Sequence, residues 1–124
     1  MVVHAESGVD IDRVFRALAD STRRDIVARV LEREQSVSEL AARYEMSFAA
    51  VQKHVAVLER AELVRKRRSG REQLVRGEVA SLRRASRLLE EYERLWRDRV
   101  DRIADVLAED GARPPEDREK GHAR

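Results

Sequence analysis

The segment from Ser47 to Ala61, SFAAVQKHVAVLERA, places the strongest constraint on the fold of this chain. Val51, Val55 and Leu58 recur at helical spacing and mark one apolar face, and Ser47 is suited to cap the first turn. A shorter helical pattern, Ser36 to Glu45, comes directly before it. A short helix, a tight turn and a second helix with a small, polar outer face suit a helix that enters a DNA groove. The same two segments could also be ordinary core helices.

The residues from Leu63 onward distinguish these two interpretations. The runs LVRKRR and EQLVR flank Ser69-Gly70-Arg71, a pattern that predicts two short strands joined by a turn. Residues 47–77 carry 8 basic and 3 acidic side chains, a local charge of +5, whereas the whole 124-residue chain has a net charge of +2. A basic hairpin after two such helices gives the order of a winged helix-turn-helix, and the clustered charge is typical of a surface that binds a polyanion. We therefore predict a mainly α fold with a small β-hairpin.

Capping signals place the remaining short helices. Asp20 can cap a helix over residues 21–33, and Ser36 with Glu39 forms a capping box at the start of the next one. Residues 10–19 predict a short amphipathic helix. The polar run from Glu32 to Gln35 is expected to be a connection. The inward-facing residues of these helices are predicted to include Ile26, Val27, Val30, Leu31, Leu40, Ala41 and Tyr44.

Residues 78–110 predict one long helix, either continuous or bent near its start, whose apolar stripe needs a partner. The stripe residues lie three or four positions apart, and a second copy of the chain is the most economical partner. The residues predicted to form this dimer interface are Ile11, Phe15, Leu82, Leu89, Tyr92, Trp96, Val100, Ile103 and Leu107. The chain is thus expected to comprise a flexible arm at 1–8, a DNA-binding domain at 9–77, a dimerisation helix at 78–110 and a disordered tail at 111–124.

Composition and motifs exclude several other classes of protein. The chain has no cysteine, which rules out disulfides and thiolate metal sites. No apolar run approaches the ~20 residues that span a bilayer, and the N-terminus lacks a signal-peptide pattern, so we expect a cytoplasmic protein with no membrane partner. No glycine loop that cradles phosphate and no nucleophile beside a base is visible. We predict neither enzymatic activity nor a cofactor.

Residues 12–76 resemble the ArsR/SmtB family of winged-helix transcriptional repressors. The resemblance rests on FRALADSTRRDIVARVL, on VSELAARYEMSFAAVQKHVAVLERAELV and on the wing RKRRSGREQLVR. It implies the scaffold, DNA binding, and a C-terminal helix like the dimerisation helix of the branch that senses no metal. Where metal-sensing relatives carry Cys-x-Cys, this chain has Ser36-Val37-Ser38, and serine is a poor ligand for soft metals. Its histidines, His4, His54 and His122, lie outside the last helix, where the other familiar metal site is found.

A further departure concerns the residue after the recognition helix. The family usually has glycine there, whereas this chain has Glu62. A left-handed backbone at a residue other than glycine costs on the order of 1 kcal/mol.

Nine residues are predicted to contact DNA. Gln52 can pair bidentately with adenine, and Phe48 or Ala49 can meet a thymine methyl group, although Phe48 could instead be partly buried against a neighbour. Ser47 is expected to cap the helix near a phosphate. His54 matches the family's histidine and is expected to be a partly buried hydrogen-bonding residue that could touch phosphate. The full set is Ser47, Phe48, Ala49, Gln52, Lys53, His54, Arg67, Arg68 and Arg71, with the three arginines on the wing reaching phosphates or a narrow minor groove unless they are merely solvated.

The sequence therefore predicts a homodimeric repressor that binds an imperfectly palindromic operator in double-stranded DNA, with its own operon as one candidate target. One alternative is a winged-helix module that binds a heterologous protein and never touches DNA. Another is a repressor that an organic effector releases, with the effector held near Trp96. The residues identify neither an effector nor an operator, and they do not decide between repressor and activator.

Overall fold

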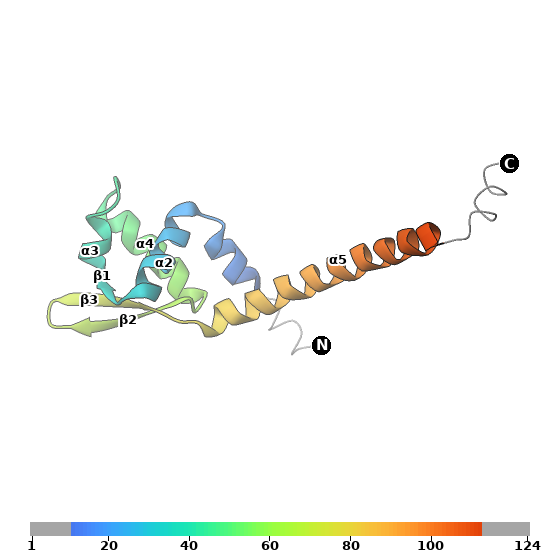
Figure 1. The fold of residues 1–124 in the computed structure, drawn as a ribbon. Helices are drawn as coiled ribbons and strands as arrows, with labels where there is room; N and C mark the ends of the chain where they lie inside the picture. The colour runs from blue at the N-terminus through green and yellow to red at the C-terminus, as the bar shows by residue number, and fades with distance from the viewer. Residues whose placement is uncertain (1–10, 113–124) are drawn as a thin grey trace. The chain divides into compact units, whose positions relative to one another are not determined.

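The computed structural model describes residues 11–112, so the predicted arm at 1–8 and residues 113–124 of the predicted tail lie outside the described part. Residues 11–18 are helical. They are followed by α2 (Ser21–Glu32), β1 (Gln35–Ser36), α3 (Val37–Ala41), α4 (Phe48–Arg60), β2 (Val64–Ser69), β3 (Glu72–Gly77) and α5 (Ala80–Ala112) (Figure 1). The chain divides into two compact units after Arg87, and the second unit contains most of α5.

The first unit contains a three-stranded antiparallel sheet in the order β1-β3-β2. β2 and β3 form the predicted hairpin, with Lys66 opposite Val75, and the turn uses Gly70 at φ +62°, a value that glycine adopts without steric cost. β1 was not predicted, because the sequence indicated only a polar connection there. Its two residues, Gln35 and Ser36, pair with the other edge of β3 and are almost fully buried.

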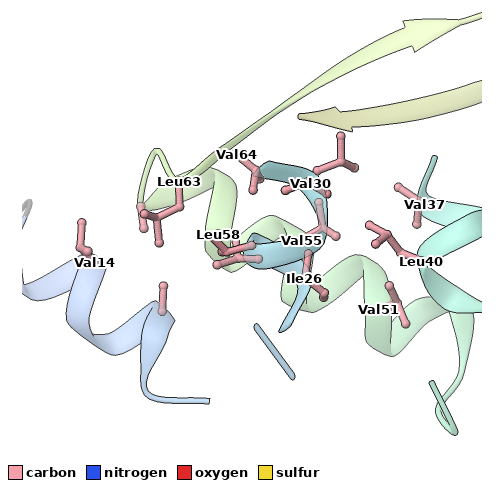
Figure 2. Packing of buried hydrophobic residues seen from close by; sticks show 14 of the residues in the cluster. Val14, Ile26, Val30, Val37, Leu40, Val51, Val55, Leu58, Leu63 and Val64 are labelled. Carbon is pink, nitrogen blue, oxygen red and sulfur yellow. The ribbon is translucent and has the colours of Figure 1, made fainter. Parts of the chain in front are cut away.

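The core of this unit lies between the helices and the start of the hairpin (Figure 2). Val51, Val55 and Leu58, the three residues that defined the apolar face of α4, are all at most 1% exposed. They pack with buried residues of the preceding helices, of the turn before β2, and of β2 and β3, which are Val14, Ala17, Ile26, Val27, Val30, Val37, Leu40, Leu63, Val64 and Val75. The inner face of α4 is therefore fully used by the fold, and only its outer face is left for another molecule.

All three predicted helix caps are confirmed. The Asp20 carboxylate accepts from the backbone N–H of Arg23 at 3.1 Å, and the Ser47 hydroxyl accepts from the N–H of Ala50 at 3.1 Å. Ser36 and Glu39 form the capping box, each side chain accepting from the other's backbone N–H at 3.0 Å. These bonds satisfy backbone donors that the first turn of a helix leaves unpaired.

Other boundaries differ from the prediction. α3 ends at Ala41 rather than near Glu45, because the next N–H groups bond three residues back: Arg43 to Leu40 at 3.0 Å and Tyr44 to Ala41 at 3.3 Å. This tighter winding closes the helix. α5 is continuous from Ala80 to Ala112, so it includes two residues assigned to the tail. No helix among residues 11–112 is long and apolar enough to cross a membrane.

Leu31 was predicted to face inward but is 42% exposed. It lies against Gly77, where an added Cβ would come within 2.5 Å of the Leu31 Cδ2 and 3.2 Å of its Cα. The end of β3 therefore approaches α2 too closely for any side chain at position 77. The leucine covers this backbone contact rather than entering the core.

Glu62 adopts the left-handed conformation anticipated from its position, with φ +58°. We expect Glu62→Gly to raise the free energy of unfolding by roughly 1 kcal/mol, because glycine removes the steric cost of this conformation. Denaturant unfolding measures the change. Glu62→Ala is the matched control, since it removes the exposed carboxylate that lies 3.9 Å from Arg84 but keeps the strain. An equal gain in both variants would attribute the effect to charge instead.

Candidate nucleic-acid interface

The outer face of α4 presents the side chains predicted to enter a DNA groove. Phe48, Ala49, Gln52 and Lys53 are all exposed, and Phe48 is 47% exposed, so it is not buried against a neighbour. Ser47 is also exposed, and its hydroxyl is occupied as the cap of the helix. The N-terminal half of α4 therefore combines an amide, an ammonium group and an apolar ring on one accessible surface.

His54 lies at the flank of this surface and is half-buried. Its Nδ1 is 3.3 Å from Nη1 of Arg23, a residue of α2. The histidine is thus a partly buried hydrogen-bonding residue, as predicted. Arg23 was not among the predicted site residues, because nothing in the sequence indicates that positions 23 and 54 meet.

The wing arginines differ in how firmly the protein already holds them. Arg67 forms a bidentate ion pair with Glu34, with Nε–Oε2 and Nη2–Oε1 distances of 3.0 and 2.8 Å. Its guanidinium holds the pKa of the Glu34 carboxyl below its usual range. Arg68 and Arg71 are exposed and have no ion-pair partner among residues 11–112. Only two of the three predicted wing contacts are therefore free of a competing carboxylate.

Acidic side chains also neutralise the base of the wing. Arg65 and Arg76 lie 3.0 and 3.5 Å from Glu78, and Lys66 lies 3.4 Å from Glu59. The net charge of +5 counted along residues 47–77 includes Glu59 but not Glu34 or Glu78, which lie outside that segment. Uncompensated positive charge is thus concentrated at the tip of the wing.

A partly buried hydrogen-bond network fixes the turn that leads into α4. Tyr44 in this turn donates a hydrogen bond to the Asp25 carboxylate of α2, which also accepts from Nε of Arg29 at 2.8 Å. Desolvation and the nearby Asp25 carboxylate raise the pKa of Tyr44 to about 12. The hydrogen bond from Tyr44, together with Arg29, lowers the pKa of Asp25. The network ties α2 to the segment that positions the start of α4.

This network predicts a stability loss at alkaline pH. The pKa of Tyr44 is about 12 in the folded state and about 10 in an unfolded chain, so its contribution is complete below pH 10 and is lost as the pH rises toward 12. We expect Tyr44→Phe to be less stable than wild type by about 1 kcal/mol near neutral pH, with the difference shrinking between pH 10 and 12. Denaturant unfolding at a series of pH values measures it. A difference that does not vary with pH would contradict the assignment.

The residues predicted to form a dimer interface fall into two groups. Ile11, Phe15 and Leu82 are partly buried within the first unit, and the last two pack against its core. The others are 41–66% exposed along α5, with Arg99 lying over the Trp96 ring at 6.0 Å. This second group comprises Leu89, Tyr92, Trp96, Val100, Ile103 and Leu107. A row of six large apolar residues exposed to water on one helix is unfavourable unless another surface covers it.

Ser36 and Ser38, which stand where metal-sensing relatives carry Cys-x-Cys, differ in their surroundings. Ser36 is 1% exposed and its hydroxyl is used in the capping box, whereas Ser38 is exposed. Within the described residues, no group of three or more histidine, aspartate or glutamate side chains is arranged to hold a metal ion. His4 and His122 lie outside this part of the chain.

A capped helix with an accessible polar face, a turn-linked helix before it and a basic three-stranded wing define a DNA-binding protein of the winged helix-turn-helix class. The family model described as "Bacterial regulatory protein, arsR family" matches residues 20–66. The HTH-type transcriptional regulator Rv2034 of Mycobacterium tuberculosis is 33% identical over 100 residues, which is 81% of this chain and 91% of Rv2034. This chain belongs to the ArsR family of transcriptional regulators.

A second relative is the HTH-type transcriptional regulator KmtR, also of M. tuberculosis, which is 39% identical over 77 residues; the match spans 55% of this chain and 59% of KmtR. Among solved structures, an ArsR-like transcriptional regulator from Rhodococcus sp. RHA1 has a TM-score of 0.67 at 33% identity, covering 82% of this chain and 95% of its own. The homodimeric winged helix-turn-helix DNA-binding domain of Mb0332 from Mycobacterium bovis has a TM-score of 0.60 at 26% identity. The match covers 74% of this chain and 87% of the Mb0332 domain. The resemblance therefore extends well beyond the helix-turn-helix itself.

Proposed function

We propose that this protein is a homodimeric repressor that binds an imperfectly palindromic operator through α4 and the tip of the wing. The observation that carries the proposal is the accessible face of α4, on which Gln52 and Lys53 are exposed while Val51 and Val55 are buried beneath them. Gln52 would read adenine in the major groove, and Phe48 or Ala49 would meet a thymine methyl group. Repression would follow from steric exclusion of RNA polymerase at the promoter.

The wing supplies the second part of the proposed interface. The guanidinium groups of Arg68 and Arg71 are exposed and lack a carboxylate partner in the described residues, so phosphates can bind them without displacing an internal ion pair. Phosphate contacts of this kind set register and affinity, whereas base contacts supply specificity. The two surfaces would therefore play different roles in the complex.

Homodimer formation is supported by the six exposed apolar residues of α5 and by the similarity to Mb0332, whose winged helix-turn-helix DNA-binding domain is homodimeric. A two-fold axis would place two copies of α4 in successive major grooves, roughly 34–36 Å apart. The engagement of the Ser36 hydroxyl in the capping box, together with the absence of thiolates at the start of α3, supports a regulator that senses no metal at that position.

Selection of bound sequences from genomic and random DNA tests the function directly. We expect a recovered motif with two related half-sites about one helical turn apart. Gln52→Ala should relax the preference at one position of each half-site, and each lost base contact costs roughly 1–3 kcal/mol. Arg43→Ala, in the exposed turn before α4, is the matched control, because it leaves the side chains proposed to enter the groove unchanged. Failure to enrich any sequence, together with a monomeric or heteromeric state, would favour a protein-interaction module instead.

A further inference from the structure

Arg23 connects three helices through one guanidinium group. Its Nε and Nη2 donate to the backbone carbonyls of Ala17 and Arg16 at 2.6 and 3.0 Å, at the end of the first helix. Its Nη1 lies 3.3 Å from Nδ1 of His54 in α4. The side chain is only 18% exposed, and its Nη1 is also 4.0 Å from the Asp20 carboxylate. The guanidinium is therefore fixed from several sides before any ligand arrives.

This contact decides which nitrogen of His54 carries the proton. A guanidinium group has only donors and stays charged at every pH that a protein experiences. Nδ1 must therefore accept the hydrogen bond from Arg23 with its lone pair. A neutral imidazole with a free lone pair on Nδ1 carries its single proton on Nε2. In the absence of this bond, the ring could adopt either tautomer.

The Nε2–H group points away from Arg23 and has no hydrogen-bond acceptor among residues 11–112. Because Nδ1 is turned toward Arg23, Nε2 lies on the other side of the ring, and no residue in the described part of the chain accepts a hydrogen bond from it. His54 is half-buried and follows Lys53, which belongs to the exposed face of α4. Asp20, the nearest acidic neighbour of the pair, already accepts from the backbone N–H of Arg23 at 3.1 Å.

We propose that Arg23 is a positioning residue that holds His54 as the Nε2–H tautomer, so that this group donates to a DNA phosphate beside the recognition surface. The phosphate contact of His54 rests on the proposed DNA binding, whereas the assignment of its tautomer does not. A phosphate oxygen is an acceptor only, so a ring with its proton on Nδ1 would present the wrong group to it. Arg23 thus acts on DNA through His54 without needing to contact DNA itself.

The tautomer can be measured without DNA. Nitrogen-15 NMR of the histidine rings distinguishes the Nε2–H tautomer from the Nδ1–H tautomer. Comparison with His54→Gln assigns the signals. We expect the Nε2–H form to predominate in wild type and a mixed population in Arg23→Met. Arg24→Met is the matched control, because Arg24 also bonds to the first helix, through the Leu18 carbonyl at 2.7 Å, but has no bond to His54. A predominant Nδ1–H form in wild type would overturn the proposal, even if Arg23→Met failed to fold.

The phosphate contact is tested by two substitutions at position 54. The glutamine amide nitrogen can replace the Nε2–H donor, whereas the shorter asparagine places its amide nearer to the position of Nδ1. With a selected operator fragment, we expect His54→Gln to bind within about twofold of wild type and His54→Asn to bind about tenfold more weakly. Equal losses in the two variants would overturn the phosphate role. Absence of DNA binding by wild type would refute the proposed function and the phosphate role together, while the tautomer assignment would stand or fall on the NMR result alone.

Discussion

Replacing Trp96 and Ile103 together by glutamate is expected to convert the proposed dimer into a monomer and to abolish tight operator binding. The two side chains are 61% and 50% exposed on α5, so neither is part of the core and the monomer should keep its fold. Covering a large apolar side chain contributes roughly 1.5–3 kcal/mol, and a dimer would contain four of them. Their loss, with buried carboxylates in their place, should weaken the dimer by more than about four orders of magnitude.

Light scattering measures the oligomeric state, and a DNA titration measures the affinity for a complete operator and for a single half-site. Ala108→Glu is the control, because it adds an exposed glutamate to the same helix on a different face from the stripe. We expect the double variant to bind the operator no better than a half-site. A double variant that stays dimeric would show that the stripe of α5 does not form the interface, and the exposed row would then require another partner.

Local signals in the sequence predicted most of the secondary structure and the exposed face of α4. Asp20, Ser36 and Ser47 cap helices because each side chain bonds within three residues of itself, and such bonds depend little on the rest of the fold. The left-handed conformation of Glu62 is also local. The order of two helices and a basic hairpin then sufficed for the fold class, which solved relatives share.

Contacts between residues distant in sequence account for what could not be predicted. β1 exists because Gln35 and Ser36 meet the open edge of β3 some 40 residues later, and two residues show no alternation that could reveal a strand. Similarly, Glu34 meets Arg67 and Arg23 meets His54 only after the helices have packed. Counting charge along the chain therefore overestimated the number of wing arginines without a carboxylate partner. Arg23, which we propose orients His54, was missed because its contact with His54 is equally distant in sequence.

The second large effect concerns DNA binding by the wing. Arginines that look alike in the sequence are expected to contribute differently to its salt dependence. We expect Arg68→Ala with Arg71→Ala to reduce the slope of log Kobs against log salt concentration by about 3.6, since the proposed dimer loses four phosphate contacts and each contributes about 0.9. At low salt the affinity should fall by roughly two orders of magnitude. Arg67→Ala should change the slope by much less than 1, because binding of its guanidinium to phosphate would first have to displace Glu34 at 2.8 Å.

Glu34→Gln provides the decisive comparison for this prediction. The variant removes the negative charge that competes for Arg67 in each protomer of the proposed dimer, so the slope should rise by up to about 1.8 and binding should tighten. Arg67→Ala in the same background should cancel the gain. Arg97→Ala, which removes a positive charge from α5, controls for net charge alone. Equal slopes for Arg67→Ala and the Arg68/Arg71 pair would mean that DNA readily displaces the ion pair with Glu34. Because a carboxylate that shares an arginine with DNA weakens binding to every sequence equally, Glu34 should change affinity without changing the preferred operator.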